Sequence, residues 1–210
     1  LKSFDPSSLS RLTLENGFPV FEYVPWNRKI RVNLRGRHQA LNAGVALLAC
    51  DVLQENEIGI QRDRVIEGLN EVVWAGRLDL IQENPPILLD CAHNPMGAKS
   101  LAAFLKDYGW KDAVVLFTAM KDKKISTMLH QISRFTRYMI LTRVEPFARC
   151  ATEEQLEKAC TGESIPHEFI EPVGQALKAA ISRAQDRKLP LVIFGSIYLA
   201  GEILKTVRQS

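Results

Sequence analysis

Hydrophobic residues follow two different patterns along this chain, and the change between them divides it into two parts. The first thirty-five residues hold two alternating apolar stretches, Gly17 to Val24 and Lys29 to Leu34, which are typical of strands joined by a turn. Two strands cannot bury a sheet face alone, so we expect them to be disordered, to pack back on the domain, or to pair with another chain's edge. Apolar positions at helical spacing then predict helices over about 38–54 and 63–72.

Beyond about residue 76, apolar runs alternate regularly with amphipathic segments. The pattern predicts strands at 77–81, 86–90, 113–118, 138–142, 167–170 and 191–195, and helices at 95–108, 125–135, 152–159, 173–187 and 196–207. A strand followed by a helix five times over indicates an α/β fold, a Rossmann-like, mostly parallel sheet with helices on both faces. The break in composition at residues 74–77 is the predicted boundary, so residues 1–72 and 73–210 are interpreted as separate domains.

Composition and charge exclude several classes of protein. The hydrophobic fraction is 46%, which is ordinary for a globular chain, and the formal net charge is only +3. No basic run with interleaved aromatic residues is present, so we expect no nucleic-acid partner. No apolar run approaches the length that crosses a bilayer, so we expect no membrane partner and a cytoplasmic location. The four cysteines form no CxxC pair and no zinc-like spacing, which predicts reduced thiols and no metal site.

The segment at residues 88–95, LLDCAHNP, is the most informative part of the sequence. It is predicted to be a buried strand that ends on Asp90, then a tight turn with His93, then a helix capped by Asn94 with Pro95 in its first turn. Open α/β sheets bind ligands at the carboxyl ends of their strands, where helix N-termini attract phosphate or carboxylate groups. A carboxylate at such a strand end suits ribose hydroxyls, so we favour a functional role for Asp90.

Three other segments are candidates for chemistry. Arg77 follows Gly76 at the predicted boundary, where it is either a solvated charge or a guanidinium that binds phosphate. The cluster at residues 120–124, MKDKK, is equally well a solvated loop or a basic lip over an anionic substrate. Ser196 is either a plain helix cap or part of a cradle for a carboxylate. No phosphate-cradling GxxxxGK[ST] loop is present, so the chain carries half of an active site.

Five motifs, taken together and in order, resemble the C-terminal part of folylpolyglutamate synthase/dihydrofolate synthase, a family of the Mur ligase superfamily. Residues 36–43 (GRHQALNA) match the family's G-x-H-Q-x-x-N-A, and residues 74–78 (WAGRL) match its W-x-G-R-x. Residues 89–95 (LDCAHNP) match D-G-A-H-N-P, residues 120–123 match M-x-D-K, and residues 195–199 (GSIYL) match G-S-L-Y-L. Cys91 stands where the family has glycine, and Lys124 replaces the final Asp of its D-K-D cluster.

The resemblance implies a role for each matched position. Asn42, Arg77 and Asp90 are expected to contact ATP, with Arg77 at the phosphates and Asp90 on the ribose or adenine side. His93 and Asn94 are expected to face the reacting phosphate and the incoming L-glutamate, and Ser196 to lie near the glutamate site. The implied reaction is ATP-dependent: a carboxylate of folate or dihydropteroate becomes an acyl phosphate, which the amine of glutamate attacks.

The resemblance also bears on what this chain lacks. Residues 1–72 are expected to be the tail of a central ATPase domain, whose P-loop and Mg²⁺ ligands belong to an absent N-terminal part. The chain alone is therefore expected to be inactive. Two alternatives stay open: a free-standing nucleotide-binding or interaction module that has lost ligase chemistry, and a fragment of a Mur-type peptidoglycan amino-acid ligase. A nicotinamide enzyme is excluded because no GxGxxG opens any predicted helix.

Overall fold

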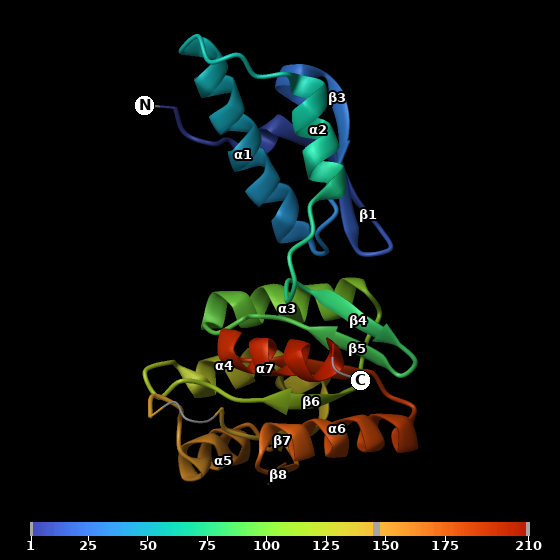
Figure 1. The fold of residues 1–210 in the computed structure, drawn as a ribbon, viewed down its shortest axis with the longest axis vertical. Coiled ribbons are helices and arrows are strands. Elements are labelled where there is room, and N and C mark those ends of the chain that lie inside the picture. The colour runs from blue at the N-terminus through green and yellow to red at the C-terminus, as the bar shows by residue number, and fades with distance from the viewer. Residues whose placement is uncertain (1, 145–147, 209–210) are drawn as a thin grey trace. The chain divides into compact units, whose positions relative to one another are not determined.

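The computed structural model describes residues 2–144 and 148–208, and the chain divides into two compact units (Figure 1). The first unit is Leu1–Ala75 and the second is Gly76–Ser210, so the division falls three residues after the predicted residue 72. Each unit has its own hydrophobic core.

The N-terminal unit contains an antiparallel sheet of strands β1 (Leu9–Glu15), β2 (Phe18–Tyr23) and β3 (Arg28–Arg31), in that order. The predicted hairpin is β2 and β3, joined through the short helix η2 (Val24–Trp26). Strand β1, which follows the short helix η1 (Pro6–Ser8), was not predicted. Its alternation is interrupted because the pairing with β2 shifts between Ser10 and Thr13, and Arg11 there has φ of +53°.

Two helices complete this unit, α1 (Arg37–Glu55) and α2 (Arg62–Glu71), as the helical spacing predicts. Phe21 and Ile30 from the sheet are buried with Leu47 of α1 in one core cluster. The expectation that the two predicted strands have no sheet of their own is wrong, because β1 supplies a third strand and the helices supply an apolar partner. The structure thus orders the segment within its own unit.

The C-terminal unit is built on a sheet whose six strands, among the described residues, have the order β4-β5-β9-β6-β7-β8. Their bounds are Asp79–Glu83, Pro86–Leu89, Leu191–Phe194, Ala113–Phe117, Thr136–Leu141 and His167–Phe169 in that order. Only β4 runs antiparallel, and the other five strands are parallel. The predicted Rossmann-like α/β fold is confirmed. Strand β4 begins two residues later than predicted, because Leu78 adopts φ of +46° and belongs to the preceding turn.

Helices cover both faces of this sheet. Helices α3 (Pro95–Asp107), α4 (Ile125–Ile132) and α5 (Glu153–Gly162) share one core with Val115 and Phe117 of β6. Helices α6 (Val173–Arg187) and α7 (Ile197–Arg208) share the other core with Val114 and Leu116 of the same strand. Successive side chains of a strand point to opposite faces, which explains why β6 is apolar throughout. The predicted end of the fourth helix is instead a short 3-10 turn, η3 (Ser133–Phe135).

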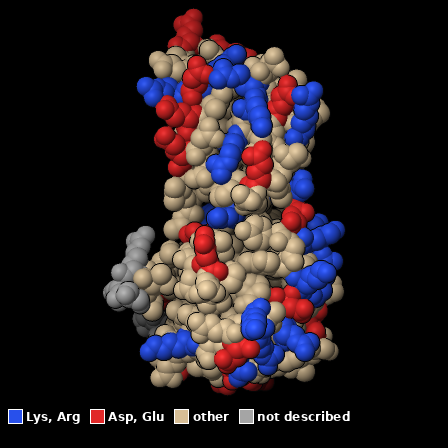
Figure 2. Space-filling model, turned by 90° about the vertical axis from the view of Figure 1, so that its right-hand side faces the viewer, with Lys and Arg blue, Asp and Glu red and all other residues tan. Residues whose placement is uncertain are grey.

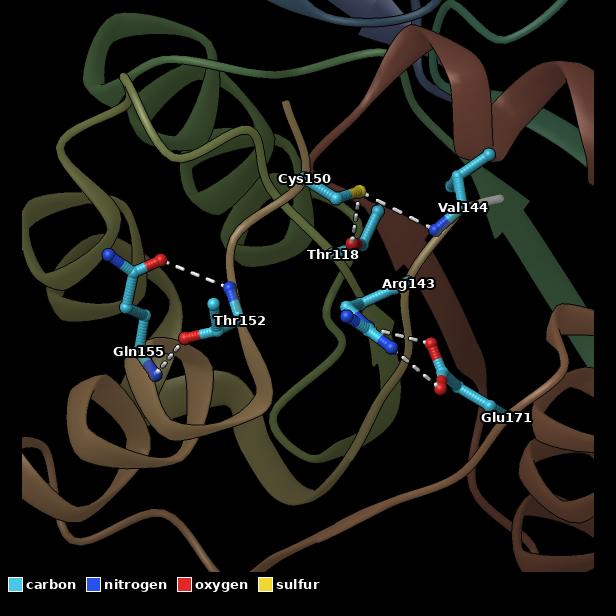
Figure 3. A network of polar contacts seen from close by, with 7 residues as sticks. All are labelled: Thr118, Arg143, Val144, Cys150, Thr152, Gln155 and Glu171. Carbon is cyan, nitrogen blue, oxygen red and sulfur yellow. Dashed lines mark hydrogen bonds and ion pairs between the residues drawn. The ribbon is translucent and has the colours of Figure 1, made fainter. Parts of the chain in front are cut away.

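Polar contacts hold the described residues just after β6 and β7, where the hydroxyl oxygen of Thr118 lies 3.8 Å from the sulfur of Cys150 (Figure 3). The guanidinium of Arg143, just after β7, donates to both carboxylate oxygens of Glu171 at 2.8 and 3.1 Å. The predicted capping box at the start of α5 is confirmed: the hydroxyl of Thr152 accepts from the backbone of Gln155, whose side chain accepts from the backbone of Thr152. The carboxyl edge of the sheet is therefore bordered by well-anchored turns.

The segment at the end of the N-terminal unit, residues 72–74, contains the most exposed apolar side chain of the described chain. Val73 is 81% and Trp74 is 64% exposed, and residues 72–74 have no regular structure. We expect brief digestion with chymotrypsin to cut first after Trp74, because exposed irregular backbone is the preferred site of nicking. Mass spectrometry should then find fragments 1–74 and 75–210. A first cut inside either unit, for example at the buried Trp26, would contradict this division.

Candidate active site

The carboxyl ends of the neighbouring strands β5 and β9 lie where the connections to the following helices leave the sheet on opposite faces. The turn after β5 leads to α3 on one face, whereas the turn after β9 leads to α7 on the other face. Neighbouring strands whose connections leave to opposite faces create a crevice, which is where open α/β sheets bind ligands. The backbone amide of Gly195 donates to the carbonyl of Ala92 at 2.9 Å and holds the two turns together.

Asp90 lies directly after β5 and organises this turn through backbone groups. One carboxylate oxygen accepts from the backbone amide of Leu78 at 2.9 Å, and the other accepts from that of Ala92 at 2.8 Å. The residue is only 9% exposed, and burial raises its pKa to about 6 although both hydrogen bonds and the charges of Arg77 and His93 act to lower it. Asp90 thus has a structural function, which the sequence did not reveal because its partners are main-chain amides.

The turn at Gly76 approaches the Asp90 turn closely. The backbone amide of Cys91 donates to the carbonyl of Gly76 at 2.7 Å, and a Cβ added to Gly76 would lie 2.8 Å from the Cys91 sulfur. Gly76 also has φ of +72°, which favours glycine. Cys91 itself has no positive φ, so a cysteine is accommodated where the family pattern has glycine. Its side chain is half-buried, and burial raises the pKa of the thiol.

His93 and Asn94 connect the turn to α3. The Nδ1 atom of His93 lies 3.0 Å from the carbonyl oxygen of Cys91; since a carbonyl only accepts, Nδ1 is the donor. In the neutral ring, Nε2 is then the acceptor. Asn94 caps α3 as predicted, and its side-chain oxygen accepts from the backbone amide of Gly97 at 2.8 Å.

Ser196 occupies the matching position after β9. Its hydroxyl oxygen accepts from the backbone amide of Tyr198 at 3.1 Å, and the residue is 2% exposed. This contact is the capping interaction that the sequence offered as one of two readings. The preceding residue, Gly195, has φ of +112°, and a Cβ there would lie 2.0 Å from the carbonyl oxygen of Thr118. The ends of β9 and β6 therefore meet at a position that only glycine fits.

The structure brings five of the six predicted site residues into one part of the C-terminal unit. Asp90, His93 and Asn94 share the turn after β5, Ser196 follows β9, and the exposed Arg77 stands beside Leu78, which Asp90 binds. The sixth residue, Asn42, belongs to the N-terminal unit. It is exposed on the first turns of α1, and its side-chain amide donates to the side-chain oxygen of Gln39 at 2.9 Å.

This arrangement suits an anionic ligand. Arg77 offers a planar guanidinium, α3 directs the positive end of its dipole at this edge, and His93 offers a ring whose tautomer is fixed by Cys91. The phosphates of a nucleotide match these groups in charge and hydrogen bonding. Asp90 fits a ribose less well, because both of its oxygens already accept from the backbone. Within the described residues, no group of three or more His, Cys, Asp or Glu side chains is arranged to hold a metal ion.

An open α/β sheet with polar residues at the carboxyl ends of neighbouring strands has the architecture of the doubly wound class, which binds ligands at that edge. Residues 76–206 match the family model "Dihydrofolate synthetase, C-terminal domain". The chain belongs to this family, as the motifs predict. The family's other members are folate glutamate ligases.

Similar proteins support the same assignment. The chain is 30% identical over 181 residues to the dihydrofolate synthase/folylpolyglutamate synthase of Bacillus subtilis, covering 85% of this chain and 41% of that protein. It is 28% identical over 192 residues to the dihydrofolate synthetase of Saccharomyces cerevisiae, covering 83% and 45%. This chain therefore corresponds to the C-terminal portion, less than half, of each relative.

Solved structures share the fold. Folylpolyglutamate synthase of Mycobacterium tuberculosis, complexed with ADP and AMPPCP, superposes with a TM-score of 0.83 at 24% identity, covering 95% of this chain and 47% of that chain. Escherichia coli FolC in complex with DHPP and ADP superposes with a TM-score of 0.76 at 21% identity, covering 95% of this chain and 46% of that chain.

None of the helices in the described part of this chain is long and apolar enough to cross a membrane. On the face in Figure 2, acidic and basic side chains are interspersed.

Proposed function

We propose that this chain is the C-terminal part of an ATP-dependent ligase that adds L-glutamate to folate or dihydropteroate through an acyl phosphate. The observation that carries the proposal is that the matched family region, residues 76–206, contains the whole strand-end site from Arg77 to Ser196. Relatives named for dihydrofolate and folylpolyglutamate synthesis, and neighbours solved with ADP, support the nucleotide and the substrate class. A cytoplasmic location is part of the same proposal.

In this proposal each of the six predicted site residues has one role. Arg77 neutralises phosphate charge, and Asn42 contributes from the N-terminal unit. Asp90 accepts a hydrogen bond from the Leu78 amide and so holds the loop that contains Arg77. It is not proposed to contact ATP directly, because both of its carboxylate oxygens already accept from the backbone. His93, with Nδ1 held by Cys91, directs Nε2 toward the reacting groups, and Asn94 and Ser196 fix the helix N-termini where glutamate binds. Catalysis would rest on positioning and charge neutralisation.

The remaining parts of the reaction are assigned outside this chain. We propose that the P-loop and the Mg²⁺ ligands belong to the part of the relatives that this chain does not span. ATP bound with Mg²⁺ supplies the phosphoryl group. Residues 1–72 are then the tail of the ATPase domain.

A Mur-type peptidoglycan ligase is the second candidate, because a diaminopimelate ligase of Caldanaerobacter subterraneus is 26% identical over 164 residues. The folate assignment is preferred because the family model and the more similar relatives agree on it.

A ligation assay tests this function. The purified chain, given ATP, Mg²⁺, L-glutamate and either dihydropteroate or tetrahydrofolate, should form no product. A chimera in which this chain replaces the matching C-terminal share of the Bacillus subtilis relative should form the amide with the folate substrates. Turnover by the chain alone would contradict the proposed division of labour. A folded chimera that accepts a muramyl peptide instead of a folate would favour the second candidate.

Arg77 provides a test on the isolated chain. We expect Arg77→Ala to weaken ATP binding by about tenfold, because a charge-assisted contact contributes about 1.5–3 kcal/mol and part of that is screened at an exposed site. Isothermal titration at low salt measures the dissociation constant. Arg137→Ala removes another exposed arginine, on β7, and should leave the dissociation constant unchanged. Equal loss in both variants would mean that only net charge matters.

A further inference from the structure

A cavity of about 430 Å³ lies between the loop after β6, the first turn of α4 and one side of α5. Four of its lining residues are lysines, namely Lys121, Lys123, Lys124 and Lys158. Among the described residues, no carboxylate lines it. A concave surface that is lined by one sign of charge concentrates ligands of the opposite sign. None of the six predicted site residues lines this cavity, so the strand-end site does not account for it.

The positive charge of this cavity is only partly neutralised by its surroundings. Asp122, which is not one of the lining residues, pairs with Lys123 at 3.0 Å and with Arg149 at 3.6 Å. The acidic residues of α5 are not part of the lining either. Three of the four lysines are exposed and have no ion pair among the described residues, namely Lys121, Lys124 and Lys158. Their ammonium groups are therefore available to a ligand.

Neutral donors in the first turn of α4 complement these lysines. Ser126 and Thr127 line the cavity, and neither hydroxyl group has a hydrogen-bond partner among the described residues. The first turn of α4 contains no acidic residue, and Lys124 gives the helix no side-chain cap. No side chain of this turn therefore offsets the positive end of the helix dipole. The cavity thus offers ammonium and hydroxyl donors to the oxygens of an anion.

Lys124 is the residue that separates this cavity from the family's sequence pattern. That pattern ends its D-K-D cluster with Asp at this position, whereas residues 122–124 of this chain are DKK. An Asp here would place a carboxylate in the lining, and Lys124 replaces it with an ammonium group. The charge of the cavity is thus a feature of this chain and not of the family's pattern.

The walls of the cavity are held in place by the backbone. The amide of Lys121 donates to the carbonyl of Arg149 at 2.8 Å, and that of Ala151 donates to the carbonyl of Ala119 at 2.9 Å. These bonds tie the loop after β6 to the segment that enters α5. The capping box then fixes Gln155, which lines the cavity (Figure 3). The lysines are therefore presented from a common, anchored frame.

We propose that this lysine cavity binds a small phosphate polyanion, that is, two or three linked phosphate groups. Each phosphate group presents several acceptor oxygens, which match the ammonium and hydroxyl donors of the lining. Lysines contributed by two separate segments suit linked phosphates better than one compact anion. The volume also falls within the range of small-molecule sites, about 300–1,000 Å³. Free polyphosphate and the triphosphate of a nucleotide share this chemistry. The proposal does not depend on ligase activity.

Isothermal titration of tripolyphosphate at low salt tests the proposal. The whole chain carries Arg77→Ala throughout, because this change removes the guanidinium of the strand-end site. Tripolyphosphate should still bind, and added salt should weaken its binding. Adding Lys124→Asp, which restores the family's residue, should weaken binding by at least about tenfold, because a charge-assisted contact is lost and a repelling carboxylate is gained. Adding Lys124→Arg keeps the charge and should leave the affinity within about threefold.

The matched control is Lys106→Asp on α3, which makes the same change of net charge outside the cavity. It should leave the affinity for tripolyphosphate within about twofold. Equal weakening by Lys124→Asp and Lys106→Asp would overturn the proposal, as would equal binding of citrate or no binding of tripolyphosphate. Thermal unfolding by circular dichroism verifies that each variant is folded.

Titration of ATP into the same proteins distinguishes the two sources of the phosphate groups. An ATP affinity that falls with Lys124→Asp, as the tripolyphosphate affinity does, identifies the triphosphate of a nucleotide as a ligand. An ATP affinity that does not change identifies free polyphosphate instead. Because Arg77 is absent and no ligation is measured, failure here is distinguishable from failure of the ligase assignment.

Discussion

Replacing Gly195 by alanine should destabilise the C-terminal unit by about 2–6 kcal/mol. Gly195 has φ of +112°, which costs an alanine about 1–3 kcal/mol, and the new Cβ would lie 2.0 Å from the carbonyl oxygen of Thr118. The nearest atom is backbone, so relief requires the ends of β9 and β6 to move apart, at a further cost of about 1–3 kcal/mol. The total is a large fraction of the stability of an ordinary domain.

Urea unfolding followed by circular dichroism measures this change. Gly201→Ala is the matched control, because Gly201 lies in α7, has no positive φ, and has open space where a Cβ would be. It should stabilise the protein by about 0.5–1 kcal/mol, since alanine is the better helix former. A Gly195→Ala variant within about 1 kcal/mol of the parent would show that the two strand ends are not closely packed.

Asp90→Asn should also destabilise the unit, by about 1–3 kcal/mol at neutral pH. The substitution keeps the shape of the side chain, but its NH2 group must face the amide of either Leu78 or Ala92. One buried backbone donor then loses its acceptor and meets another donor, which costs about 1–3 kcal/mol. Asp112→Asn, at an exposed carboxyl before β6, should change stability by less than about 0.5 kcal/mol.

The contribution of Asp90 to the free energy of unfolding depends on pH, because its pKa differs between the folded and unfolded states. The folded pKa of Asp90, about 6, lies above the unfolded value of 3.8, so between these values the folded state binds more protons than the unfolded state. The contribution of Asp90 to stability is therefore greatest below pH 4 and falls as pH rises to 6, by roughly 3 kcal/mol. Groups that both proteins share cancel in the difference between parent and Asp90→Asn. That difference should be larger at pH 4 than at pH 7, and the opposite trend would contradict a raised pKa.

Much of the architecture follows from local sequence patterns. The five strand–helix pairs and the capping box at Thr152 are visible because their periodicity and cap chemistry are local. Strand β1 was missed because a register shift and the positive φ of Arg11 break its alternation. The late start of β4 was missed because Leu78 has a backbone conformation that its residue type does not signal.

The site was only partly predictable for a different reason. The motif placed Asp90, His93 and Asn94 together because they share one turn, and the helix cap followed from residue type. The bond from Asp90 to the backbone amide of Leu78, and the bond from Cys91 to the carbonyl of Gly76, join segments that are twelve or more residues apart. Such contacts depend on the tertiary packing of the β4–β5 hairpin, and no side chain in the sequence reports them. The ligand roles of these residues stay predictions.

We propose that the strand-end turn, with Arg77, forms one wall of an ATP site. The most direct measurement is a titration of the ¹⁵N-labelled chain with ATP, followed by two-dimensional NMR of the backbone amides. Shifts should concentrate at residues 76–78, 91–97 and 195–198, even if binding is weak, and should be absent from the α6 surface. Uniformly scattered shifts, or none at these positions at millimolar ATP, would contradict it.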